Sequence, residues 1–218
     1  MFPSILKETA EFVIADKPSG LLAIPGRGER AGEETLKDML EKKYGSIYVV
    51  HRLDRDVSGA ILFAKTPEAH KYYSKLFETR NIEKTYIALV CGKMTGRGEI
   101  NKPLKQRGSG RVSVVFDGKP SVTAWRVMKN YGNKWTLVEA RIITGRRHQI
   151  RAHFYSIGHP IAGDALYGDA LYGDIAEQKL FPRVLLHSWK IKFQDMDGKN
   201  VFAEAFPPED FQNVLEMI

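Results

Sequence analysis

Residues 51–59 read His51-Arg52-Leu53-Asp54-Arg55-Asp56-Val57-Ser58-Gly59. Five of the first six side chains in this stretch are polar or charged. Apolar runs stand on both sides, at residues 48–50 and 60–64, and such short apolar runs are typical of buried strands. Loops that a rigid scaffold holds in place often carry chemistry, so the stretch indicates either a functional loop or a solvated turn.

The rest of the chain mixes predicted strands and helices. Apolar residues at helical spacing predict helices over 36–44, 67–77 and 148–157. Turn residues at Asp117-Gly118 and Asp197-Gly198 predict two hairpins, one joining 112–116 to 121–128 and one joining 185–193 to 201–206. Further strands are predicted over 12–15, 21–24, 84–91 and 135–143. Strands joined mostly by short turns, with helices between them, predict an α+β fold with a mixed, mostly antiparallel sheet.

Length and composition limit the class of protein. The 218 residues suffice for one large domain or two small ones, and 43% hydrophobic residues suffice for a globular core. Lys and Arg outnumber Asp and Glu by 33 to 26, and the formal charge of +7 favours a polyanionic partner such as nucleic acid. No apolar run approaches the roughly 20 residues of a membrane helix, and the N-terminus lacks a secretory pattern. We therefore expect a cytoplasmic protein with no membrane partner.

Sequence motifs for metals and nucleotide cofactors are weak or missing. The single cysteine, Cys91, permits no internal disulfide and no cysteine-based zinc site. His148 and His153 are five positions apart, whereas two zinc ligands on one helical face are four apart. Residues 26–31 match the dinucleotide pattern G-x-G-x-x-A, but His51 stands where an acid should bind ribose, so we interpret them as a turn. With no P-loop and no G-x-S-x-G motif, we expect no metal and no cofactor.

A second dense stretch runs from Arg146 to His153 and holds three arginines and two histidines. If the helix begins at Arg147, Arg147 and Arg151 share one face, where like charges need anionic partners. A phosphate or a carboxylate suits the shape of arginine. The alternative is a surface helix of a basic protein, although Gln149 and the histidines among the arginines disfavour it.

Two further segments have both a functional and a structural interpretation. The loop 102–111 carries Lys105, Arg107 and two other cations without an acid, and is either a mobile loop that contacts phosphates or a solvated loop. Tyr86, at the start of a predicted strand, either packs in the core or offers a ring for base stacking and a hydroxyl for proton transfer. The segment 164–168 is copied at 169–173, and we interpret the copy as a small loop duplication.

Taken together, the motifs resemble the RluA family of pseudouridine synthases over residues 12 to 211. In chain order, the matching segments are Asp16 to Leu21, His51 to Asp54 with Ser58-Gly59, Lys84-Thr85-Tyr86, Gly145 to Arg151, Gly158 to Ile161 with Gly163-Asp164, and Leu186-His187. The sequence departs from the family in two places. Val57 replaces the usual threonine, and the 164–168 segment is duplicated.

The resemblance implies the pseudouridine synthase fold, with an active-site cleft across the sheet, in one catalytic domain over residues 1–218. It implies no separate N-terminal RNA-binding domain, since only about 50 residues precede Asp54. The implied reaction cuts the N1–C1′ bond of uridine, turns the base and joins C5 to C1′, without a cofactor. The implied substrate is structured ribosomal or transfer RNA, such as a stem-loop, and we expect the protein to be a monomer.

The resemblance also assigns residues to roles. Asp54 is the essential carboxylate, Tyr86 stacks on the flipped uracil, and Arg151 pairs with Asp54, with Arg146 as the other candidate for that pairing. Arg52 fills the gap that the flipped base leaves in the RNA. The remaining candidates for RNA contact are Lys84, Lys105, Arg107, Arg146, Arg147 and His148.

Two other functions stay open at this point. One is an RNA-binding protein that has the fold but no catalytic activity, which the presence of Asp54 and Tyr86 disfavours. The other is an unrelated hydrolase that uses Asp54 and Asp56 as a carboxylate pair on one side of a strand.

Overall fold

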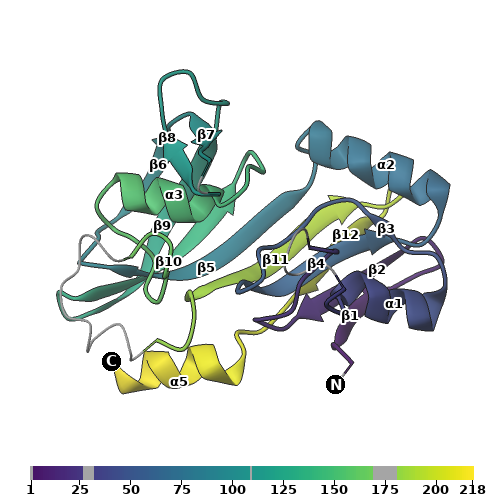
Figure 1. Ribbon diagram of the computed structural model, residues 1–218, viewed down its shortest axis with the longest axis horizontal. Coiled ribbons are helices and arrows are strands. Elements are labelled where there is room, and N and C mark those ends of the chain that lie inside the picture. The colour runs from purple at the N-terminus through teal and green to yellow at the C-terminus, as the bar shows by residue number, and fades with distance from the viewer. Residues whose placement is uncertain (1, 27–31, 109, 169–180) are drawn as a thin grey trace. The chain divides into compact units, whose positions relative to one another are not determined.

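The computed structural model describes residues 2–26, 32–108, 110–168 and 181–218. Within these ranges the chain forms two compact units. Unit 1 comprises Met1–Glu83 and Ser188–Phe206, and unit 2 comprises Lys84–His187 and Pro207–Ile218. The chain therefore passes from unit 1 to unit 2, returns to unit 1, and ends in unit 2, as the colours of Figure 1 show.

Unit 1 is built on antiparallel strands. Along its sheet, the order is β1-β2-β4-β11, with β3 beside β4 and β12 beside β11, and each of the pairs β1–β2, β2–β4, β3–β4 and β11–β12 is antiparallel. Two helices complete the unit. The bounds are β1 Ile5–Glu8, β2 Phe12–Lys17, α1 Leu36–Tyr44, β3 Tyr48–Val49, β4 Ser58–Ala64, α2 Pro67–Glu78, β11 Leu186–Gln194 (in unit 1 from Ser188) and β12 Asn200–Glu204.

Threonine side chains cap the N-termini of the two helices of unit 1. The Thr35 side chain accepts a hydrogen bond from the Asp38 backbone N–H, and the Asp38 carboxylate accepts one from the Thr35 N–H, which is a complete capping box for α1. At α2, the Thr66 side chain accepts a hydrogen bond from the Ala69 backbone N–H, and Pro67 occupies the first turn, where the missing N–H costs nothing. The predicted helices over 36–44 and 67–77 are confirmed.

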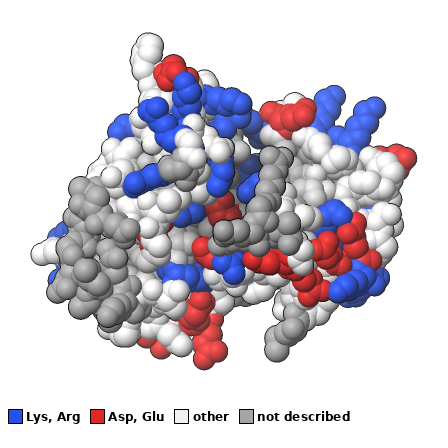
Figure 2. Space-filling model, viewed as in Figure 1, with Lys and Arg blue, Asp and Glu red and all other residues white. Residues whose placement is uncertain are grey.

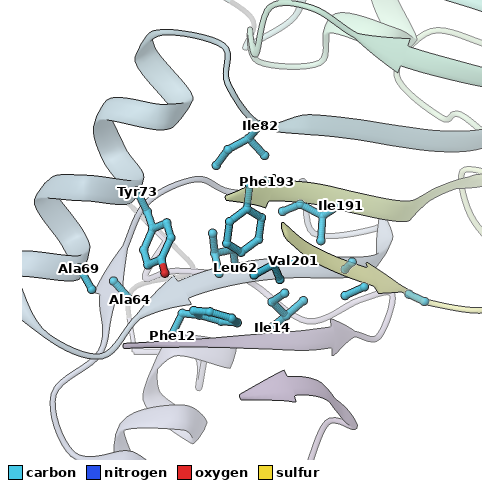
Figure 3. Packing of buried hydrophobic residues seen from close by; sticks show 13 residues of the cluster. Phe12, Ile14, Leu62, Ala64, Ala69, Tyr73, Ile82, Ile191, Phe193 and Val201 are labelled. Carbon is cyan, nitrogen blue, oxygen red and sulfur yellow. The ribbon is translucent and has the colours of Figure 1, made fainter. Parts of the chain in front are cut away.

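The core of unit 1 lies between its sheet and α2 (Figure 3). The rings of Phe12, Tyr73 and Phe193 pack edge to face, with centroids 5.4 to 5.7 Å apart, and such contacts add to the burial of the rings themselves. All seven residues of β4 are buried, because the strand lies inside the sheet. The predicted hairpin of 185–193 with 201–206 is confirmed as β11 and β12, and these strands supply Ile191 and Val201 to the core.

The described residues of unit 2 form an antiparallel sheet in the order β5-β10-β9-β6, a separate two-stranded sheet β7–β8, and the helices α3 and α5. The bounds are β5 Glu83–Cys91 (in unit 2 from Lys84), β6 Arg97–Asn101, β7 Leu104–Gln106, β8 Val112–Val114, β9 Val122–Tyr131, β10 Trp135–Ile142, α3 Gln149–Ser156 and α5 Glu209–Met217. With the antiparallel strands of unit 1, this arrangement confirms the α+β class. Cys91 is buried, as expected of a core residue.

Two predicted elements are wrong. Residues 112–116 do not form a hairpin with 121–128, because β8 pairs with β7 whereas β9 pairs with β6 and β10. Residues 21–24 form no strand. Instead, the carbonyls of Leu22 and Ala23 accept hydrogen bonds from the first N–H groups of α1, at Leu36 and Lys37. These carbonyls therefore pair with the free N–H groups at the start of the helix and not with a neighbouring strand.

Candidate active site

The loop that carries Asp54 joins β3 to β4 in unit 1. Tyr48 pairs with Ala64 and Val49 with Phe63, so the ends of the loop are held together by the two strands. At its start, the His51 ring stacks on Phe77 with centroids 4.5 Å apart. The Nε2 atom of His51 accepts a hydrogen bond of 2.9 Å from the Leu62 backbone N–H. His51 is therefore a structural anchor of the loop.

Lys17 holds the other side of the loop. Its side chain is fully buried, and its Nζ donates hydrogen bonds to the carbonyls of Pro18 at 2.9 Å, Leu21 at 2.8 Å and Arg55 at 2.7 Å. A buried ammonium is stable only when its donors are satisfied. The three bonds therefore tie the turn at 16–21 to the loop that carries Asp54, and sequence reasoning did not assign this role to Lys17.

Further bonds fasten the same turn to the same loop. The backbone N–H of Gly20 donates to the Arg55 carbonyl at 3.0 Å, and the Arg55 Nε donates back to the Gly20 carbonyl at 2.8 Å. The Ser19 hydroxyl donates to the Asp56 carbonyl at 2.8 Å. Gly20 has φ +83°, a conformation that suits glycine. The turn at residues 16–21 therefore supports the Asp54 loop through hydrogen bonds, and we call it the brace of that loop.

Within this braced loop, Asp54 is half-buried and Arg52 is exposed. The Asp54 carbonyl accepts a hydrogen bond of 3.2 Å from the Val57 N–H, which closes a tight turn directly after the carboxylate.

Next to Lys17 in β2, burial raises the pKa of Asp16 to about 6, and the positive charge of Lys17 partly opposes that rise.

In unit 2, Lys84 and Tyr86 lie two positions apart on β5 and so face the same side of the sheet. Both are buried, and Tyr86 is opposite Ala140 of β10. Burial lowers the pKa of the Lys84 ammonium to about 8. A Cβ placed on Gly145 would lie 3.8 Å from the Lys84 Nζ, so Lys84 is next to the loop that carries Arg146.

The loop before α3 presents its arginines to solvent. Arg146 and Arg147 are exposed and His148 is half-buried with a left-handed backbone at φ +51°. Helix α3 begins at Gln149, so the predicted start at His148 is one residue early, and Arg147 is not on a helical face with Arg151. Gln149 fixes the loop, because its Oε1 accepts hydrogen bonds from the Thr144 hydroxyl at 2.7 Å and the Arg146 N–H at 3.0 Å.

Arg151, in contrast, is buried and paired within unit 2. Its Nε and Nη2 donate to the two carboxylate oxygens of Asp164, both at 2.7 Å, in the two-pronged geometry that suits a guanidinium. The same carboxylate accepts hydrogen bonds from the backbone N–H groups of Leu166 and Tyr167. Asp164 belongs to one of the sequence motifs that match the family, but the motif does not predict its pairing with Arg151.

Tyr167 is the centre of this cluster. Its ring is buried, and the guanidinium carbons of Arg111 and Arg151 lie 5.0 and 5.2 Å from its centroid. Its hydroxyl accepts a bond of 2.8 Å from the Val112 N–H and lies 3.2 Å from the Nδ1 of His148. Tyr167 therefore joins β8 to the start of α3. The copy of its segment at 169–173 lies outside the described residues, as does most of the 26–31 motif.

Lys105 and Arg107 lie on the β7–β8 hairpin, and both are exposed. Figure 2 shows Lys and Arg side chains gathered where Figure 1 labels β7, β8 and α3. A Cβ placed on Gly110 would lie 3.6 Å from the Arg147 Nη2, so the end of the hairpin is close to the basic loop before α3. Unit 2 thus brings Arg107, Arg111 and Arg147 onto one surface.

The predicted residues therefore form two groups, one in each unit. Arg52 and Asp54 share the braced loop of unit 1, whereas the others lie in unit 2: Lys84, Tyr86, Lys105, Arg107, Arg146, Arg147, His148 and Arg151. In the described ranges, no three His, Cys, Asp or Glu residues are grouped to hold a metal ion. No described helix is both long and apolar enough to cross a membrane.

Comparison with solved structures supports the fold. The human protein named RNA Pseudouridylate Synthase Domain Containing 1 matches with a TM-score of 0.79 at 23% identity, covering 94% of this chain and 84% of that one. The human protein named RNA Pseudouridylate Synthase Domain Containing 4 matches with a TM-score of 0.78 at 22% identity, covering 98% of this chain and 92% of that one. The predicted pseudouridine synthase fold is confirmed.

Sequence comparison identifies the family. The profile of the family described as RNA pseudouridylate synthase matches residues 11–156. The Dual-specificity RNA pseudouridine synthase RluA of Pasteurella multocida is 36% identical over 201 residues, which cover 90% of this chain and 89% of that protein. The Ribosomal large subunit pseudouridine synthase D of Nitrosomonas europaea is 35% identical over 225 residues, 98% of this chain but 64% of that longer protein. The chain therefore belongs to the RNA pseudouridylate synthase family, as an RluA-type isomerase that acts on RNA.

Proposed function

We propose that the protein converts uridine to pseudouridine in a structured ribosomal or transfer RNA, with Asp54 as the essential carboxylate. The observation that carries the proposal is the bracing of the Asp54 loop by Lys17, Gly20 and His51. A catalytic group must be held in one geometry, and rigid support from neighbouring elements provides it. The relatives named RluA and synthase D support a ribosomal or transfer RNA substrate.

The reaction balances without a cofactor. The N1–C1′ bond breaks, the uracil turns, and C5 forms a bond to C1′. The proton on C5 leaves to water and N1 gains a proton, so the product is an isomer of the substrate. Asp54 acts at the junction of sugar and base, either by adding to it or by removing a sugar proton.

Arg151 is proposed as the partner of Asp54. It is buried, whereas the other candidate, Arg146, is exposed. The Asp164 carboxylate also engages Arg151, through Nε and Nη2. A guanidinium in this place would donate charge-assisted hydrogen bonds to the carboxylate and fix its orientation.

The remaining residues bind and position the RNA. Tyr86 stacks on the uracil after it leaves the RNA helix, and Arg52 fills the space that the base vacates. Exposed cations of unit 2 contact phosphates, which would make RNA affinity dependent on salt. They are Lys105, Arg107, Arg146 and Arg147, with Lys84 and His148 nearer the base. We propose that one monomer suffices for activity.

The test uses RNA tritiated at C5 of uridine and counts the tritium that is released to water. Asp54→Asn should lower the rate of release by at least about 100-fold, because it removes the charged catalytic group. Asp56→Asn is the matched control, since Asp56 is an exposed acid of the same loop that bonds through its carbonyl, and it should keep the wild-type rate.

Other outcomes would contradict the proposal. RNA binding by the wild type without release of tritium would identify an inactive RNA-binding protein. Release that survives in Asp54→Asn would remove Asp54 from the chemistry. Profiling of pseudouridine in cells with and without the gene then identifies the target RNA.

A further inference from the structure

Phe116 is exposed to an unusual degree. Its side chain has 102% of the reference exposure, whereas the next most exposed large apolar side chain among the described residues, Phe206, has 73%. An aromatic ring that is fully in water gains nothing from folding. An exposed apolar group of this size often marks a surface that binds a partner.

The backbone at Phe116 is held in a defined turn. The Gly118 N–H donates to the Val115 carbonyl at 3.0 Å, so Phe116 and Asp117 are the two central residues of the turn. Leu104 and Lys119 exchange two backbone hydrogen bonds of 2.8 and 2.9 Å directly beside it. A Cβ on Gly118 would lie 2.7 Å from the Leu104 nitrogen, so the turn packs against the strand and is not a loose loop.

The turn is part of a hairpin arm, which we define as residues 104–119. The arm is fixed to the rest of unit 2 by a small core of Leu104, Val112, Ala152 and Tyr167. The Tyr167 hydroxyl accepts a hydrogen bond of 2.8 Å from the Val112 N–H and donates one of 3.1 Å to the Val112 carbonyl. Phe116 is thus exposed on a supported element, and a supported aromatic side chain binds with little loss of entropy.

The charge of the arm selects the partner. The arm carries four cations, Lys105, Arg107, Arg111 and Lys119, against the single carboxylate of Asp117. That carboxylate forms an ion pair with Lys105, so it is partly neutralised. Lys105, Arg107 and Lys119 are exposed. A fully exposed aromatic ring among exposed cations has the two components of a surface for single-stranded nucleic acid, namely a stacking platform and contacts to phosphate.

We propose that Phe116 stacks on an unpaired base of the RNA substrate, outside the nucleotide that is modified, while the exposed cations of the arm hold the adjacent phosphates. The proposal rests on the RNA pseudouridine synthase function above and adds a second point of recognition to it. Stacking is tolerant of base identity because every base has a flat face. Phe116 therefore selects RNA with an unpaired nucleotide at this position, and not a particular base.

The first experiment measures binding of a fluorescein-labelled stem-loop RNA with an unpaired, uridine-containing loop. Phe116→Ala should weaken binding by roughly 5- to 150-fold, the range for loss of one stacked base. Phe116→Trp should bind as well as the wild type or better. Phe206→Ala is the matched control, because Phe206 is also an exposed aromatic residue, and it should leave binding unchanged.

The salt dependence of RNA affinity distinguishes the contribution of the Phe116 ring from that of the cations. A stacking contact releases no counterions, so Phe116→Ala should weaken binding equally at low and high salt. Arg107→Gln should reduce the slope of log affinity against log salt concentration by about 0.7 to 0.9 per lost contact. A change of salt slope in Phe116→Ala would contradict the proposal.

A photochemical experiment identifies the contact directly. RNA with 5-iodouridine in its loop is bound and irradiated, and tandem mass spectrometry should locate an adduct on Phe116. The proposal is overturned if adducts form elsewhere and Phe116→Ala binds like the wild type. It is also overturned if Phe116→Ala only abolishes self-association, measured by light scattering, since the ring then serves a second copy of the chain.

These results are independent of the catalytic assignment. Tritium release by the wild type tests the proposed reaction, whereas the Phe116 variants test binding. A protein that binds RNA through Phe116 but releases no tritium would retain the further inference and refute the proposed activity. A protein that releases tritium but binds RNA equally well without the Phe116 ring would support the proposed activity and refute the further inference.

Discussion

Lys17 in unit 1 and Arg151 in unit 2 are both buried cations, and the structure satisfies them in different ways. Lys17 donates to three backbone carbonyls, whereas Arg151 donates to the carboxylate of Asp164. The first arrangement joins two stretches of main chain whatever side chains they carry. The second depends on one particular residue. The Asp54 loop is thus braced through its backbone, and α3 through a side-chain ion pair.

The largest effect should follow loss of the backbone brace. In Lys17→Met, three partly buried carbonyls lose a charged donor, and a hydrogen bond to a charged group contributes about 1.5–3 kcal/mol. We expect the free energy of unfolding in urea to fall by about 4 kcal/mol, and tritium release to fall further than stability alone explains, because the Asp54 loop is released. Lys7→Met replaces an exposed lysine of β1 and should change stability by less than about 0.5 kcal/mol. Equal free energies of unfolding for Lys17→Met and Lys7→Met would contradict the proposed role of Lys17 in supporting the Asp54 loop.

Loss of the ion pair should have the next largest effect. Asp164→Asn leaves the buried Arg151 charge without its carboxylate, which should lower the free energy of unfolding by about 3 kcal/mol. Asp197→Asn, which removes an exposed partner of Lys199, is the control and should cost less than about 1 kcal/mol.

A double variant sharpens the comparison. Arg151→Met with Asp164→Leu should recover much of the stability that Asp164→Asn loses, because an apolar pair of similar volume replaces a buried ion pair at little cost. Its activity should stay low, since the proposed partner of Asp54 is gone. A double variant as unstable as Asp164→Asn would show that the hydrogen bonds of Asp164 to Leu166 and Tyr167 matter more than the ion pair.

The smallest effect concerns Asp16, the neighbour of Lys17. Burial raises its pKa from 3.8 to about 6, so between these values the folded state holds more protons than the unfolded state. Stability should therefore fall as the pH rises from about 4 to 6. Asp16→Asn should flatten this part of the stability curve and stabilise the protein at pH 7, as measured by urea unfolding across pH. Asp56→Asn should keep the wild-type slope, and an unchanged slope in Asp16→Asn would contradict the assignment.

The same comparison shows what sequence reasoning can find. Elements that depend on side chains were predicted well. Apolar residues at helical spacing located α1 and α2, and Asp197-Gly198 located the turn between β11 and β12. The apolar runs on either side of the Asp54 stretch also predicted a loop between two strands, which β3 and β4 confirm. In each case the signal is a residue type whose chemistry acts locally.

Features that depend on backbone partners were missed. The role of Lys17 was not predicted because a carbonyl is present at every position, and nothing in residues 18, 21 and 55 marks their carbonyls as its acceptors. The hairpin of 112–116 with 121–128 was predicted wrongly, because the three residues of β8 show too little alternation to reveal that β7 is their partner. Tyr167 was missed because its segment was read only as a repeat.

The path of the chain between the units bears on how the protein matures in the cell. The unit 1 segment Ser188–Phe206, which holds β12 and most of β11 and completes the hydrophobic core, follows most of unit 2 in the sequence. During synthesis, the segment up to Glu83 therefore lacks Ile191, Phe193 and Val201 until the chain has been extended past residue 201. Because β11 and β12 complete this core, unit 1 can bury its apolar residues only after the intervening segment, Lys84–His187, has been synthesised.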